Sequence, residues 1–171
     1  MIVVSDTSSI YYLVLVEQID RLHDLYHRVI IPSSVYEELQ APATPRAVHA
    51  WLSSQPAWLE VVSLSRTPDS GLDYLGAGER DAITLAQDLR ADRLLIDDRD
   101  GRREASQREL LVIGTLGVLA VSAERDLLDL ADVIDRLRAT TFRASPRLLT
   151  ALVERYGQKS SSLDPKKSHK S

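Results

Sequence analysis

Apolar residues along the chain fall into short continuous runs and longer helical stripes, which predicts strands that alternate with helices. The runs at 2–4, 29–31 and 94–96 are each bounded by polar or turn residues, as expected of strands buried on both faces. Stripes with apolar residues every three to four positions predict helices over 8–17, 20–26, 33–41, 45–54 and 76–89. This order predicts an α/β fold with a central parallel sheet and helices on both faces.

The same alternation continues toward the C-terminus. Residues 59–64 are typical of an edge strand and 110–113 of a further strand, so we expect four to five strands in the sheet. Further helices are predicted over 99–109, 116–121, 127–139 and 145–156. From Gly157 onward almost nothing is apolar, which predicts a disordered basic tail. The predicted organisation is a main domain over 1–125, a helical extension packed on it over 126–156, and a tail over 157–171.

Acidic residues gather where the predicted strands end. Because the carboxyl ends of parallel strands face one crevice, these acids are expected to lie near one another. The acids concerned are Asp6, Glu38 (or Glu37), Glu79, Asp81, Asp97 and Asp98. Like charges in such a crevice repel one another, and a divalent cation removes that conflict. Oxygen ligands without cysteine favour Mg²⁺ or Mn²⁺, which suit phosphoryl transfer or phosphodiester hydrolysis.

Each acid taken alone also has a purely structural interpretation. Asp6 can cap a helix, and Asp97 with Asp98 can form a turn. Glu79 and Asp81 can compensate a helix dipole, and helical projection places Glu79 nearer the apolar stripe and Asp81 at its edge without choosing between them. The joint pattern still favours a site, because independent caps need not fall at the ends of successive strands.

Composition narrows the class of protein. The 171 residues include no cysteine, which excludes disulfides and thiolate metal sites and fits the reducing cytoplasm, where we expect the protein. No apolar stretch is long enough to predict a membrane span. The net charge of −4 argues against a broad basic surface but not against a nuclease. A haloacid-dehalogenase-type phosphatase or a phosphate-receiving domain fits poorly, because Ser8 stands where the former requires aspartate and no lysine precedes the tail.

Several segments, taken in order, resemble the PIN domain, the nuclease fold of VapC-type toxins, in a branch with a C-terminal extension. They are VVSDTSSI (3–10), VIIPSSVYEELQAP (29–42), GAGERDAITLA (76–86), DRLLIDDRDGRREA (92–105) and LLVIGTLGVL (110–119), and they span about two-thirds of the chain. The resemblance implies a three-layer α/β/α architecture and Mg²⁺- or Mn²⁺-dependent endoribonuclease activity. It also implies an RNA substrate, a homodimer and control by a small antitoxin.

The resemblance assigns roles to particular residues. It implies that the catalytic metal ligands are Asp6, Glu38, Asp81 and Asp98, with Glu37 a less favoured substitute for Glu38. It implies that the supporting residues are Ser8, Glu79, Asp97 and Thr115. Next to the acids, Arg99, Arg102 and Arg103 are predicted to hold RNA phosphates, or else to form a solvated helix face with Arg–Glu pairs.

The predicted function is therefore a metal-dependent endoribonuclease acting as a toxin. Alternatives are a housekeeping RNA-processing nuclease, and a PIN-fold module that binds RNA or protein with little or no cleavage. The apolar faces of the helices after Leu127 are expected to pack on the core or on a second subunit, or to form an antitoxin groove.

Overall fold

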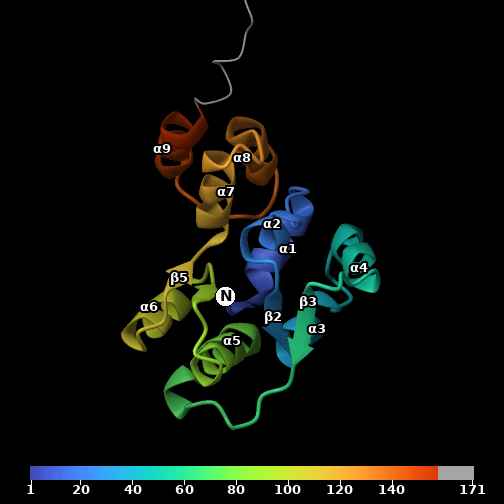
Figure 1. Cartoon of the computed structure of the whole chain (residues 1–171), viewed down its shortest axis with the longest axis vertical. Coiled ribbons are helices and arrows are strands. Elements are labelled where there is room, and N and C mark those ends of the chain that lie inside the picture. The colour runs from blue at the N-terminus through green and yellow to red at the C-terminus, as the bar shows by residue number, and fades with distance from the viewer. Residues whose placement is uncertain (158–171) are drawn as a thin grey trace, which may run out of the picture. The chain divides into compact units, whose positions relative to one another are not determined.

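A five-stranded parallel sheet is the centre of the structure, a computed structural model that describes residues 1–157 (Figure 1). The strands are β1 (Val3–Ser5), β2 (Val29–Pro32), β3 (Leu59–Val62), β4 (Arg93–Leu95) and β5 (Val112–Ile113). They lie in the order β3-β2-β1-β4-β5, and all neighbours are parallel. The predicted α/β fold and its parallel sheet are confirmed, and β3 is an edge strand as expected.

Helices connect the strands. They are α1 (Thr7–Leu15), α2 (Arg21–Tyr26), α3 (Ser33–Leu39), α4 (Arg46–Ser53), α5 (Ala77–Asp88), α6 (Arg99–Gln107), α7 (Thr115–Glu124), α8 (Leu130–Arg138) and α9 (Pro146–Tyr156). The loop before α5 contains a short 3₁₀ helix, η1 (Ser70–Leu72). Helix α1 starts earlier than its apolar stripe suggests, because the side chain of Asp6 accepts a hydrogen bond from the backbone N–H of Ser9 and so caps the helix.

The alternating side chains of the sheet explain the core. Val4, Ile30 and Leu94 lie at matching register positions and join one apolar cluster with Ala82 and Ile83 of α5. The residues that alternate with these are buried too, so the central strands are covered on both faces. Burial on both faces is what the continuous apolar runs of the sequence predict.

The direction of chain progression across the sheet reverses at β1, which pairs with β2 on one side and β4 on the other. Parallel sheets form a crevice at the carboxyl ends of the strands on either side of such a reversal. Here Ser5 of β1 pairs with Leu95 of β4, and the backbone N–H of Asp6 donates to the Leu95 carbonyl at 2.9 Å. The residues that follow β1 and β4 therefore meet at the reversal point.

The chain divides into two compact units, Met1–Val118 and Leu119–Ser171, and the boundary falls inside α7. In the second unit α8 and α9 pack against each other, with Leu130, Ile134 and Leu137 buried. Leu149 of α9 is buried as well, whereas Leu148 is exposed. The predicted tail lies outside the described residues except for Gly157. No helix among the described residues is long and apolar enough to cross a membrane.

Candidate active site

Asp6 is the most deeply buried acid of the site. Its side chain is fully buried and accepts hydrogen bonds from the backbone N–H groups of Ser9, at 3.0 Å, and Asp97, at 3.4 Å. Burial raises its pKa from 3.8 to about 8, and the nearby negative charges of Asp97 and Glu79 add to that increase. The hydrogen bonds from Ser9 oppose it. Two carboxylates from distant parts of the sequence thus act on the buried Asp6.

Asp97 connects this region to the start of α7. Its carboxylate accepts a hydrogen bond from the backbone N–H of Thr115, at 2.7 Å, and another from the Thr115 hydroxyl, at 2.6 Å. Burial raises the pKa of Asp97, while these hydrogen bonds and the positive charge of Arg102 lower it in part. Position 114 has to be glycine for this arrangement, since a Cβ there would lie 2.8 Å from Asp97 Oδ1 and 2.6 Å from Arg102 Nη1.

Glu38 reaches the site from α3. It accepts hydrogen bonds from the backbone N–H of Gly78, at 2.9 Å, and from the hydroxyl of Thr7. Helix α5 can approach this closely because residue 78 lacks a side chain: a Cβ would lie 2.5 Å from Glu38 Oε2. The adjacent Glu37 is exposed. The structure therefore brings Glu38, rather than Glu37, to the N-terminus of α5.

The two acids of α5 have different surroundings. Burial raises the pKa of Glu79, and the charges of Glu38 and Asp98 raise it further. Asp81 is only 8% exposed, and its carboxylate accepts a hydrogen bond from Arg80 Nε at 2.8 Å. The two positions are about 200° apart around a helix, so they cannot face the same way. Glu79 joins the acids at the strand ends, whereas Asp81 is neutralised by its neighbour.

Asp98 is exposed and caps α6, accepting a hydrogen bond from the backbone N–H of Gly101 at 2.8 Å. The charge of Asp98 raises the pKa of Glu79, so Asp98 belongs to the same group of acids. We call Asp6, Glu38, Glu79, Asp97 and Asp98 the acidic cluster. Hydrogen bonds or charge effects connect these five predicted site acids, whereas Asp81 is paired with Arg80.

The three arginines that were predicted to bind RNA are placed differently from one another. Arg102 lies beside Asp97 and contributes to its electrostatics. Arg103 pairs with Asp100 at 3.1 Å. Arg99 is exposed and has no ion pair or side-chain hydrogen bond within residues 1–157. Arg99 is therefore the cation best placed to meet an incoming phosphate next to Asp98.

Sequence reasoning missed Ser9, which contributes more to the site than the predicted Ser8. The Ser9 hydroxyl is buried, makes no hydrogen bond of normal geometry within the described residues, and lies close enough to lower the pKa of both Asp6 and Asp97. Ser8 is half-buried with no such contact among those residues. The capping pattern could have identified Ser9, because an N-cap side chain bonds to the third residue of its helix.

The acidic cluster fits a divalent metal ion. Its donors are all oxygen, and the carboxylate of Asp6 is fully buried among negatively charged neighbours. The buried hydroxyl of Ser9 beside it makes no hydrogen bond of normal geometry within the described residues. Hard ions such as Mg²⁺ and Mn²⁺ suit this set. Within the described residues no three acidic or histidine side chains lie close enough to share one ion as they stand. Binding therefore requires carboxylates to rotate off their present hydrogen bonds.

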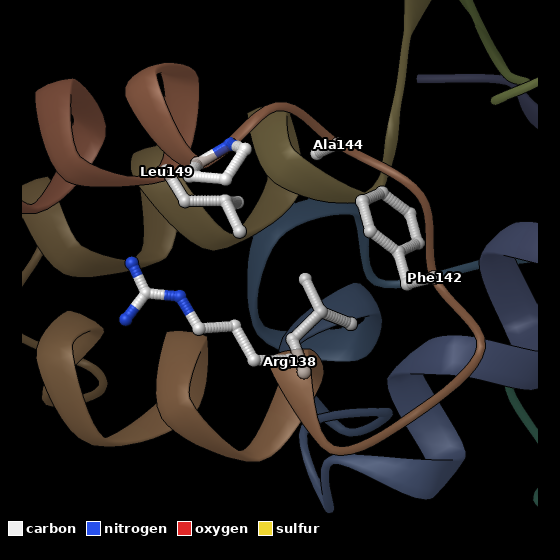
Figure 2. Close-up of a pocket in the computed structure, with 6 residues that line it drawn as sticks. Arg138, Phe142, Ala144 and Leu149 are labelled. Carbon is white, nitrogen blue, oxygen red and sulfur yellow. The ribbon is translucent and has the colours of Figure 1, made fainter.

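The second unit contains a hollow of different character (Figure 2). Its volume is about 180 Å³, and it is lined by Leu137, Arg138, Phe142, Ala144, Pro146 and Leu149. The labelled side chains of Phe142 and Leu149 lie on opposite sides of it. Its lining includes no carboxylate, so it differs in chemical character from the acidic cluster of the first unit.

Comparisons with known proteins identify the family and the fold of the chain. A family model described as a PIN domain matches residues 2–158. Among solved structures, the fold is similar to a PilT N-terminus domain protein, SSO1118, from the hyperthermophilic archaeon Sulfolobus solfataricus P2. The TM-score is 0.50 at 20% identity, over 71% of this chain and 93% of that one. No curated protein matches the chain.

Proposed function

We propose that this chain, which belongs to the PIN-domain family, is a divalent-metal-dependent endoribonuclease that hydrolyses RNA phosphodiesters at the acidic cluster. One observation carries the proposal: the buried Asp6 accepts a hydrogen bond from the backbone N–H of Asp97 where the sheet reverses direction, and the negative charges of Asp97 and Glu79 raise its pKa. Such mutual repulsion is tolerated in proteins where a cation binds.

Asp6, Glu38, Glu79 and Asp98 are the residues we assign to the metal, with Asp97 beside them. We assign Glu79 to the metal in place of Asp81, the ligand that the family resemblance implies, because Asp81 is already paired with Arg80. A bound Mg²⁺ or Mn²⁺ would neutralise these acids, polarise the scissile phosphate and favour ionisation of the attacking water.

The protein's own groups have supporting tasks in this proposal. Thr115 fixes the Asp97 carboxylate through its hydroxyl and its backbone N–H, which leaves Asp97 little freedom to rotate. Ser9 holds Asp6 in place through its backbone N–H. Arg99, without an ion pair in the described part of the chain, attracts the negatively charged substrate to the edge of the cluster.

The test is RNA cleavage by the purified chain with Mg²⁺ or Mn²⁺, with EDTA as the metal-free control. Asp98→Asn is the variant of choice because this acid is exposed, so the change does not disturb the core. Asp135→Asn, an exposed acid of α8, is the matched control. Cleavage that requires metal and Asp98 but not Asp135 supports the proposal. Intact RNA under all conditions, from protein free of any partner, contradicts it.

A second candidate is a PIN-fold protein that binds RNA or a partner without cutting. The observation that favours it is that Glu38, Asp97 and Asp98 each hold intramolecular hydrogen bonds as they stand. Calorimetric titration with Mn²⁺ separates the two candidates, since a nuclease of this type must bind the ion and a pure binding module need not.

The biological role we propose is that of a toxin in a toxin–antitoxin pair, acting in the cytoplasm as a homodimer. This extension follows the family resemblance. Its tests are growth arrest on expression, rescue by a small protein encoded beside it, and the molecular mass in solution. Expression without any effect on growth would favour a housekeeping RNA-processing nuclease instead.

A further inference from the structure

Tyr74 stands out because of its exposure. Tyr74 is 54% exposed, whereas each of the other Phe, Trp and Tyr residues within 1–157 is half-buried. It lies in the loop between η1 and α5, a few residues before Glu79. An exposed aromatic ring next to an acidic site is a surface that nucleic-acid bases can stack on.

The ring is held in place by its polar end. The Tyr74 hydroxyl donates a hydrogen bond to Glu104 Oε1 at 2.6 Å and accepts one from Arg103 Nη2 at 3.4 Å. Glu104 in turn lies 3.6 Å from Arg108. These contacts fix the side chain against α6 while leaving more than half of its surface open. A ring that is already oriented loses less conformational entropy when a base stacks on it.

Arginines connect this ring to the acidic cluster. Arg99 and Arg103 are four residues apart on α6, so they lie on the same side of the helix. Arg103 is five residues beyond Asp98, which is about 8 Å along the helix axis. A strand with one phosphate at the acidic cluster can therefore run past Arg99 and reach Tyr74 within a short distance.

We propose that Tyr74 stacks an unpaired RNA base, with Arg99 and Arg103 on the adjoining phosphates. The inference rests on the proposed function and adds a base-binding position to it. Duplex RNA cannot use this site, because its bases are already stacked within the helix. A purely structural role for Tyr74, fastening its loop to α6, predicts dependence on the hydroxyl rather than on the ring.

The experiment measures fluorescence anisotropy of a labelled oligouridine with the full chain carrying Asp98→Asn, in Mg²⁺. Tyr74→Leu removes the ring, and Tyr74→Phe is the matched control that removes only the hydroxyl. Stacking predicts that Tyr74→Leu weakens binding by about 5- to 150-fold and that Tyr74→Phe stays close to the parent. Thermal unfolding of each variant checks that the fold is intact.

An abasic nucleotide moved along the oligouridine identifies the contact. At one position the abasic site should weaken binding to the parent about as much as Tyr74→Leu does, and should weaken the Tyr74→Leu variant no further. A Tyr74→Leu variant that binds as tightly as the parent overturns the inference. Equal losses for Tyr74→Leu and Tyr74→Phe also overturn it, because the hydroxyl would then be responsible.

The two proposals fail separately. RNA cleavage by the wild-type chain with no effect of Tyr74→Leu on binding overturns the stacking site alone. Binding that depends on the Tyr74 ring without cleavage under any metal condition overturns the nuclease and supports the base site. A duplex competitor that displaces the oligouridine as well as unlabelled single strand contradicts stacking of an unpaired base on Tyr74.

Discussion

Replacing Asp6 by asparagine removes the buried acid of the cluster while keeping nearly the same shape. In the folded chain without metal, the pKa of Asp6 is about 8, against 3.8 for an ordinary aspartate. Folding therefore favours the protonated form of Asp6. Because the folded pKa lies above the unfolded one, the wild-type chain is expected to lose stability as pH rises from about 4 to about 8.

The expected magnitude follows from this difference. Between the two pKa values the folded chain holds one proton that the unfolded chain has lost, so stability falls by about 1.4 kcal/mol per pH unit. From pH 5 to pH 7 the wild-type chain should thus lose about 3 kcal/mol relative to Asp6→Asn. This is a large part of the roughly 5–15 kcal/mol that stabilises a typical domain.

The assay is urea unfolding in EDTA at several pH values for the wild type and Asp6→Asn, with stability differences compared at each pH. Asp97→Asn is the second variant. Its stability should fall with pH at the same slope, but the fall should end at a lower pH. Burial is the largest cause of the raised pKa of Asp6, and the charge of Asp97 is the next largest. Saturating Mg²⁺ should flatten the slope, because the ion binds the ionised acid. A stability difference that is constant from pH 5 to pH 7 would refute this account of Asp6.

Further substitutions test neighbouring parts of the site. Glu79→Gln should weaken Mn²⁺ binding and RNA cleavage by about 10- to 100-fold, whereas Asp81→Asn should leave Mn²⁺ affinity unchanged in calorimetry. Loss of Mn²⁺ affinity in Asp81→Asn but not in Glu79→Gln would instead make Asp81 the ligand. Glu38→Gln should weaken Mn²⁺ binding similarly and Glu37→Gln should not, and equal losses would contradict the contacts of α3. Gly78→Ala should lower the free energy of unfolding, measured in urea, by about 1–3 kcal/mol, because its Cβ would lie 2.5 Å from Glu38 Oε2. An unchanged free energy of unfolding would show that α3 and α5 can separate without cost.

The parts of the fold set by local pattern were predictable. Continuous apolar runs identified the central strands, and the acids after them, Asp6, Asp97 and Asp98, meet at the predicted edge of the sheet. The strand limits moved by about one residue: Ser5 and Pro32 belong to strands. Hydrogen bonds to neighbouring strands, which the sequence does not show, decide such limits.

The parts of the site set by distant contacts were not predictable. The choice between Glu79 and Asp81 depends on where α3 meets α5, a contact between Gly78 and Glu38 that joins residues 40 positions apart. A helical projection contains no information about that partner. Arg102 likewise lies beside Asp97 because Gly114 leaves room there. Spacing along α6 alone could not separate it from Arg99.

The pairing of β1 with β4 also has a consequence for synthesis on the ribosome. Asp6 and Asp97 are 91 positions apart, and β4, the strand that precedes Asp97, is made long after β1. A nascent chain can pair β1 with β2 early, yet its acids cannot meet before β4 has left the exit tunnel. The nuclease site that we propose would therefore be unable to form near the messenger RNA that encodes it until most of the first unit has been translated.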